Sequence, residues 1–164
     1  MNVADLLADA FGRVHERVHA AVDGLTEDEL AWRADADANS IAWLVWHLSR
    51  VQDDHVAGAL GVEQVWPKWR ERFGLTGDRV GYGDTTEQVA SVRADAELLT
   101  AYYDAVYQLT IDLVSDVTDD DLPRIVDERW DPPVTLSVRL VSVISDCLQH
   151  AGQAAFVRGI IQRR

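Results

Sequence analysis

The sequence contains a single cysteine, Cys147, among 164 residues, so no intrachain disulfide framework is available to it. It has no uninterrupted apolar run of about 18 residues, the length that marks a membrane-spanning helix. Its first residues, Met1 to Asp5, carry neither the basic start nor the apolar stretch of a signal peptide. We therefore expect a cytoplasmic protein without a membrane segment.

Basic residues are also scarce. Lysine and arginine together number 15 against 28 aspartates and glutamates, which gives a formal net charge of −13, and Lys68 is the one lysine. A negatively charged molecule repels phosphate backbones and anionic lipids. We expect neither nucleic acid nor a membrane surface as a partner, and we interpret the acidity as a contribution to solubility.

Hydrophobic residues make up 48% of the chain, enough for one core and too little for two, so we expect a single domain over residues 1–164. Apolar residues recur at three- and four-residue steps in four long segments, as they do in amphipathic helices. These segments span residues 3–23, 41–60, about 86–115 and 136–161. The pattern predicts an all-α fold, an antiparallel four-helix bundle with two long crossover connections.

The first connection, residues 61–84, contains one proline and five glycines among aromatic residues. An irregular stretch of this length in a compact domain often forms a lid or the wall of a binding pocket. Its aromatic residues could equally cover one end of the core, and both interpretations stay open. The second connection, residues 123–134, is likewise irregular.

Three residues on two of these helices suit a metal ion. Asp146 and His150 are four residues apart, so they stack on one helix face with Cβ atoms about 5–6 Å apart. His47 lies among aliphatic and aromatic residues of the second long helix. Packed side by side, the two helices would offer two imidazoles and one carboxylate, a set that leaves coordination positions open for water or substrate. A buried polar network without a metal is the competing interpretation.

A second histidine pair, His15 and His19, has the same spacing on the first helix. Charged residues surround it, and the sequence offers no third ligand nearby, so we favour partly exposed histidines over a metal site. Cys147 follows Asp146 directly, but a helical neighbour points about 100° away. We expect it to be a buried, inert thiol.

The segment Asn39–Arg50, followed after a long gap by Asp146-x-x-x-His150-Ala151-Gly152-Gln153, resembles the DinB-like superfamily of metal-binding four-helix bundles. More narrowly, it resembles the branch related to mycothiol-dependent enzymes. His47 and His150 match the family pattern of one histidine on the second helix and a pair four residues apart on the fourth. Many members carry histidine where this chain has Asp146, and carboxylate variants occur in the maleylpyruvate isomerase type.

The resemblance implies a metal-dependent enzyme that uses a low-molecular-weight thiol, mycothiol or a similar compound, as co-substrate for S-transfer to an electrophile or for isomerisation. A divalent ion held by His47, Asp146 and His150 keeps about one positive charge. A thiol bound to it would lose its proton, and the metal-bound thiolate would be the nucleophile. Zn²⁺, Ni²⁺, Fe²⁺ and Mn²⁺ all suit mixed nitrogen and oxygen ligands.

The alternative function is a non-catalytic, metal-stabilised bundle that binds a small molecule or a partner protein. Around the ligands, Gln153 could orient a ligand or bound water or make an interhelical hydrogen bond. Asp54 could support His47 or lie at a solvated helix end, and Arg158 could meet a carboxylate of the thiol or substrate or form a surface salt bridge. No catalytic residue is assigned beyond the metal ligands. The resemblance also allows a homodimer formed through an exposed helix face.

Overall fold

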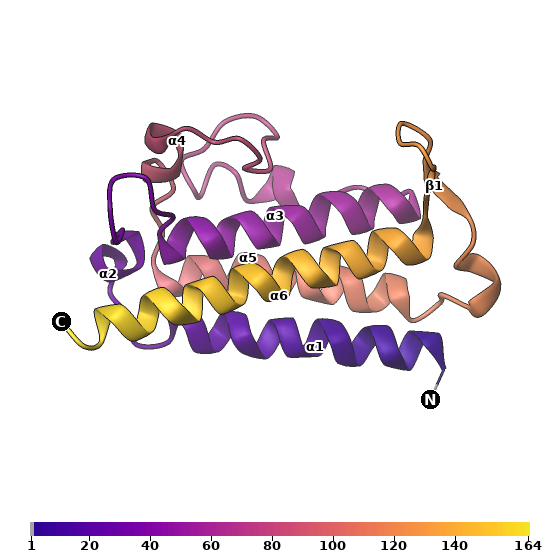
Figure 1. Cartoon of the computed structure of the whole chain (residues 1–164), viewed down its shortest axis with the longest axis horizontal. Coiled ribbons are helices and arrows are strands. Elements are labelled where there is room, and N and C mark those ends of the chain that lie inside the picture. Colours follow the sequence, from indigo (N-terminus) through magenta and orange to yellow (C-terminus); the bar gives the residue numbers. More distant parts are fainter. Residues whose placement is uncertain (1) are drawn as a thin grey trace.

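The computed structural model describes residues 2–164, in which four long helices lie alongside one another (Figure 1). They are α1 (Val3–Val22), α3 (Ile41–Leu60), α5 (Ala96–Val114) and α6 (Leu136–Ile161). Helix α6 packs against α1 and α3, and both of these also pack against α5, so the order around the bundle is α1, α6, α3, α5. The predicted all-α four-helix bundle with two long connections is confirmed.

The long connection after α3 returns the chain to the end of the bundle where α3 began (Figure 1). As a result α3 and α5 run in the same direction, whereas α3 and α6 are antiparallel, and so are α1 and α5. Within residues 2–164, none of the helices combines the length and the apolar character needed to cross a membrane.

The helix boundaries follow local capping signals. The Ser40 hydroxyl accepts a hydrogen bond from the Trp43 backbone N–H and starts α3, and Gly61 ends this helix in the left-handed conformation (φ 74°) that glycine adopts without steric cost. Thr135 caps α6 in the same way as Ser40 caps α3. These two helices, which carry the predicted metal ligands, begin and end as their sequence pattern indicates.

The prediction of one continuous third helix was wrong. The segment is divided into α4 (Thr86–Ala90) and α5, because Asp95 caps a new helix by accepting from the Leu98 N–H at 2.8 Å. Between the two helices, Arg93 pairs with Glu27 and Asp28, the first two residues of α2 (Glu27–Ala31). The break thus serves to tie this segment to the short second helix.

The second connection contains elements that the sequence pattern did not predict. A 3₁₀ turn, η2 (Asp119–Asp121), leads into a small antiparallel hairpin of β1 (Ile125–Asp127) and β2 (Val134–Thr135). The Asp127 carboxylate accepts hydrogen bonds from Arg129 and from Arg139 of α6 at 2.8–2.9 Å. These bonds hold the hairpin against the first turns of α6.

The first connection, which includes the 3₁₀ turn η1 (Trp66–Lys68), is fastened to α3 by a buried ion pair. Arg50 and Asp53 are fully buried and lie 3.5 Å apart. Asp53 accepts hydrogen bonds from the Val65 and Trp66 backbone N–H groups at 3.0 and 2.9 Å. Arg50 in turn donates to the backbone carbonyls of residues 78 and 79. Both ends of the connection are therefore held by one pair of charges.

The aromatic residues of this connection divide between the two roles that the sequence left open. Trp66 and Phe73 are buried and pack around Tyr102 of α5, so they cover the core. Tyr82 is 61% exposed and lines a cavity beside α6. The connection is thus both part of the core and part of a cavity wall.

Replacing Asp53 by alanine should destabilise the fold strongly, because it leaves the Arg50 guanidinium buried without a counter-charge. Removing one partner of a buried pair costs about 3–5 kcal/mol. Urea unfolding measures the loss. The control Asp116→Ala removes an exposed carboxylate at the end of α5 and should change the free energy of unfolding by less than about 0.5 kcal/mol. Equal unfolding midpoints for the two variants would contradict the role given to the pair.

Candidate metal centre

The antiparallel pair α3 and α6 brings His47, Asp146 and His150 together. One potential ligand atom from each lies within 4.8 Å of the others. The Nε2 of His150 is 3.6 Å from Oδ1 of Asp146, and the ring centroids of the two histidines are 4.8 Å apart. A distance of 3.6 Å is too long for a hydrogen bond. It is close to the roughly 3 to 3.5 Å that separates two ligands when each is about 2.1 Å from one ion.

Hydrogen bonds fix which nitrogen of each imidazole carries the proton. The Nδ1 of His47 donates to the Val80 carbonyl at 2.6 Å, and the Nδ1 of His150 donates to Oε1 of Gln153 at 2.8 Å. In a neutral ring the Nε2 then keeps its lone pair. Burial lowers the pKa of His47, which favours this neutral form. Each ring thus presents an Nε2 lone pair as a potential ligand.

The carboxylate between them has an unpartnered oxygen. Oδ2 of Asp146 is buried and has no hydrogen-bond partner among residues 2–164. Leaving a buried polar atom unpaired costs about 1–3 kcal/mol, and more for a charged group. A divalent cation fits this donor set, since one carboxylate and two neutral imidazoles leave a net charge of about +1.

The backbone of the first connection approaches His47 so closely that only glycine fits next to it. Gly81 has φ of +110°, and a Cβ built there would lie 2.5 Å from Nδ1 of His47. On its other side, the His47 ring stacks on Trp43 at 4.6 Å, and the Trp43 indole donates to Asp84 at 2.9 Å. Residues 80–84 therefore position His47 directly through Val80 and Gly81, and indirectly through the bond from Trp43 to Asp84.

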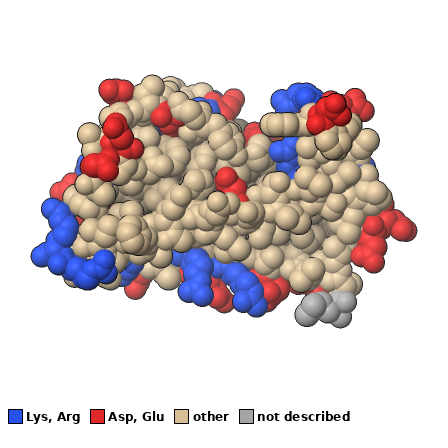
Figure 2. Space-filling view, in the orientation of Figure 1, with Lys and Arg blue, Asp and Glu red and all other residues tan. Residues whose placement is uncertain are grey.

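A cavity of about 480 Å³ opens beside Asp146. Helices α3 and α6 form its floor, Tyr82 of the first connection one wall, and Trp130 of the hairpin loop the other. Figure 2 shows this face of the molecule hollowed between the first connection and the hairpin. Arg129 and Arg139 also line the cavity, where both pair with Asp127, so with Asp146 the formal charges of its lining balance. Its volume suits a small-molecule ligand.

Comparison with known proteins agrees with this geometry. Residues 6–163 match the sequence profile described as mycothiol-S-transferase. The chain belongs to the mycothiol-S-transferase family. The resemblance to mycothiol-dependent enzymes, drawn from the sequence, is confirmed. No curated protein matches the chain.

Two solved structures extend the comparison to the whole fold. A conserved protein from Enterococcus faecalis is 30% identical, with a TM-score of 0.91 over 100% of this chain and 99% of that one. A DinB-like protein from Bacillus cereus is 18% identical, with a TM-score of 0.64 over 92% of this chain and 87% of that one. The second likeness shows the shared fold alone.

In this member of the mycothiol-S-transferase family, three residues were predicted to surround the metal ligands. One of them contacts a ligand, and the other two bond elsewhere. Gln153 contacts His150 directly. Asp54 accepts from Gln64 at 2.8 Å and lies 3.1 Å from His55, so its carboxylate is engaged at the rim of the first connection. Arg158 donates to the Ala21 carbonyl at 3.3 Å and joins α6 to α1.

Sequence reasoning missed several of the residues that line the cavity. Arg129 and Trp130 belong to a hairpin with no local signal, and Arg139 is one of several polar residues on α6. Gly81 was one glycine among five in the first connection, and nothing in the sequence distinguishes it. Cys147, as expected, is fully buried, and burial raises the pKa of its thiol.

Replacing Gly81 by alanine should cost more stability than replacing Gly83. Both glycines have positive φ, but a Cβ at Gly83 meets nothing within 4 Å, whereas at Gly81 it collides with His47. Gly83→Ala should cost about 1–2 kcal/mol from backbone conformation alone. Gly81→Ala should lose about 1–3 kcal/mol more from the overlap. Urea unfolding of both variants tests this, and equal losses would show that His47 gives way freely.

Proposed function

We propose that this chain is a divalent-metal-dependent S-transferase that joins a low-molecular-weight thiol, mycothiol or a close analogue, to an electrophile. His47, Asp146 and His150 would hold the cation. The observation that carries the proposal is the buried, unpartnered Oδ2 of Asp146, a residue that clusters with His47 and His150 and lines a cavity of ligand size. The family of the chain supports the thiol as co-substrate.

When bound, the cation would supply positive charge that favours the thiolate over the thiol, and the thiolate is the nucleophilic form. The protein's own part is to hold both imidazoles in the tautomer and orientation that leave Nε2 free. The Val80 carbonyl does so for His47 and Gln153 for His150. Hydrogen bonds of this kind to metal-binding histidines fix ring orientation and raise the basicity of the free nitrogen.

The cavity walls suit an electrophile with an aromatic or an anionic part. Tyr82 packs edge-on against His47 with ring centroids 5.2 Å apart, and Trp130 is 64% exposed on the opposite wall. Burial raises the pKa of Tyr82 to about 12, so its hydroxyl stays protonated near neutral pH and can donate a hydrogen bond. The Arg129 side chain is 86% exposed and offers its guanidinium to an anionic substituent or leaving group.

With a chloro-nitroaromatic substrate, the reaction is the substitution of chloride by the thiol sulfur. The thiol gives its proton to solvent, its sulfur forms a bond to the ring carbon, and the carbon–chlorine bond breaks to release chloride. The cavity walls, Tyr82 and Trp130, would limit access of water, which would otherwise compete for the electrophile.

Replacing His47 by alanine should lower kcat/KM for mycothiol-dependent consumption of a chloro-nitroaromatic by at least about 100-fold, equivalent to roughly 2.7 kcal/mol. The assay uses untagged protein supplied with Zn²⁺, Ni²⁺, Fe²⁺ or Mn²⁺ in turn. The control His19→Ala changes a histidine on the opposite side of the bundle and should keep activity. Wild-type protein that binds a cation at these residues but consumes no electrophile would instead identify a non-catalytic, metal-stabilised bundle.

Replacing Gln153 by leucine should weaken metal binding about 10- to 100-fold, because the Nδ1 of His150 loses its acceptor. Affinity is measured by competition with a coloured chelator. The matched control is Gln149→Leu, one turn earlier on α6, whose amide bonds only to Ser145. The same affinity in both variants would rule out the positioning role of Gln153.

A further inference from the structure

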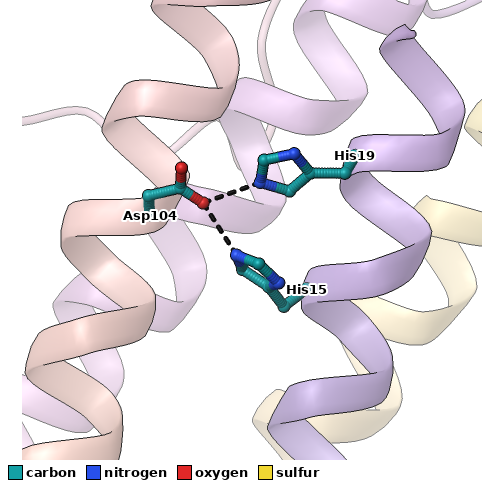
Figure 3. A group of neighbouring side chains, drawn as sticks. All are labelled: His15, His19 and Asp104. Atoms are coloured by element: carbon teal, nitrogen blue, oxygen red, sulfur yellow. Dashed lines mark hydrogen bonds and ion pairs between the residues drawn. The ribbon is translucent and has the colours of Figure 1, made fainter.

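A second cluster of two histidines and one aspartate lies between α1 and α5. The Nε2 atoms of His15 and His19 are 2.8 and 2.7 Å from the same oxygen, Oδ1 of Asp104 (Figure 3). Figure 3 shows both rings of α1 pointing at the carboxylate of the neighbouring helix. The expectation that this pair lacks a third ligand was wrong, because the carboxylate comes from a helix 85 residues further along the chain.

We propose that His15, His19 and Asp104 form a second cation site, separate from the one at His47, Asp146 and His150. Two imidazoles and a carboxylate suit Zn²⁺, Ni²⁺, Cu²⁺ or Co²⁺. Because two ligands belong to α1 and one to α5, a cation here joins the two helices. The site is independent of the S-transferase proposal, since it shares no residue with the first cluster.

The two Nε2 atoms lie slightly closer to Oδ1 of Asp104 than two ligands of a bound ion lie to each other. Ligands of one ion at about 2.1 Å are roughly 3 to 3.5 Å apart, so the three side chains need to separate by a few tenths of an ångström. Their side chains are 31%, 41% and 48% exposed, which leaves them room to move. A cation can also reach them from solvent without opening the core.

Exchange of the cluster's hydrogen bonds for a cation balances in protons. The two rings are 4.5 Å apart between centroids, and both turn their Nε2 atoms to the same oxygen of Asp104. In the metal-free cluster a neutral ring can donate its Nε2 proton to Asp104. On binding a cation, that ring carries its single proton on Nδ1 and offers the Nε2 lone pair, with no net release of a proton. A ring that starts protonated releases one proton to solvent.

The surroundings add negative charge and space. His19 borders a cavity of about 430 Å³ between α1 and α5, which the side chains of Asp23, Glu97 and Thr100 also line. Two further carboxylates near the cluster attract cations, and the cavity has room for the water molecules that complete the coordination of an ion with three protein ligands. The pair α1–α5 lies across the bundle from α3–α6, so an ion in one site cannot substitute for an ion in the other.

Metal stoichiometry tests the proposal. Untagged, chelator-treated full-length protein is titrated with Zn²⁺ in competition with a coloured chelator. In the double variant His47→Ala and His150→Ala we expect one equivalent to remain bound. Adding His19→Ala should reduce this affinity at least tenfold. The matched control Asp112→Ala, which removes an exposed carboxylate of the same helix α5, should leave it unchanged. Well under one equivalent in the double variant would overturn the second site.

The two proposals fail separately in this experiment. If Zn²⁺ binding survives His19→Ala but disappears with His47→Ala, the second site is excluded and the first stands. If it survives His47→Ala but disappears with His19→Ala, the first site fails and the second is supported.

A thermal measurement separates a cation site from a simple hydrogen-bonded contact. Zn²⁺ at about 100 times Kd should raise the Tm of the double variant by roughly 5 °C or more. The Asp104→Asn variant, which keeps the shape of the side chain but loses its charge, should show less than half of that rise. An unchanged Tm in the double variant would show that the cluster only hydrogen-bonds α1 to α5.

Discussion

The buried pair of Arg50 and Asp53 is the interaction on which the candidate metal centre depends. Asp53 holds the start of the first connection through two backbone N–H groups, and Arg50 holds its later part through the carbonyls of residues 78 and 79. The next carbonyl, that of Val80, accepts the Nδ1 proton of His47. The first connection has little regular structure, yet it orients His47. It can do so because Arg50 and Asp53, on the same helix as His47, fix the path of the connection.

The two sides of the cluster are positioned in different ways. Asp146 and His150 are one helical turn apart, so the regular geometry of α6 sets their separation, and Gln153 on the following turn accepts the Nδ1 proton of His150. His47 has no such neighbour on α3, and the first connection supplies its acceptor and the close approach at Gly81. A ligand pair on one helix needs only helix geometry, whereas the third ligand requires tertiary structure to direct it.

This difference explains what the sequence could predict. Apolar periodicity and capping residues are local, so the limits of α3 and α6 could be read directly, and the spacing of Asp146 and His150 indicated a shared face. The break before α5 was missed because apolar spacing continues across it, while the Asp95 cap and the pairing of Arg93 with α2 interrupt the helix. Asp104 was missed because its partners, His15 and His19, lie on another helix, and Arg129 was missed because only the fold places its hairpin beside α6.

The bundle places similar sets of metal-binding side chains at two opposite helix pairs, yet the two sites differ in the chemistry that they can support. Beside Asp146, both connections rise above the helices, and Tyr82 and Trp130 wall a cavity in which a substrate can be held away from water. Beside His19, the helices themselves and the turn after α1 form an open hollow lined by acidic residues. A set of metal-binding side chains needs only two packed helices, but a reaction needs a bounded space next to it. In this fold the irregular connections, and not the ligands, distinguish a site suited to catalysis from one suited to joining helices.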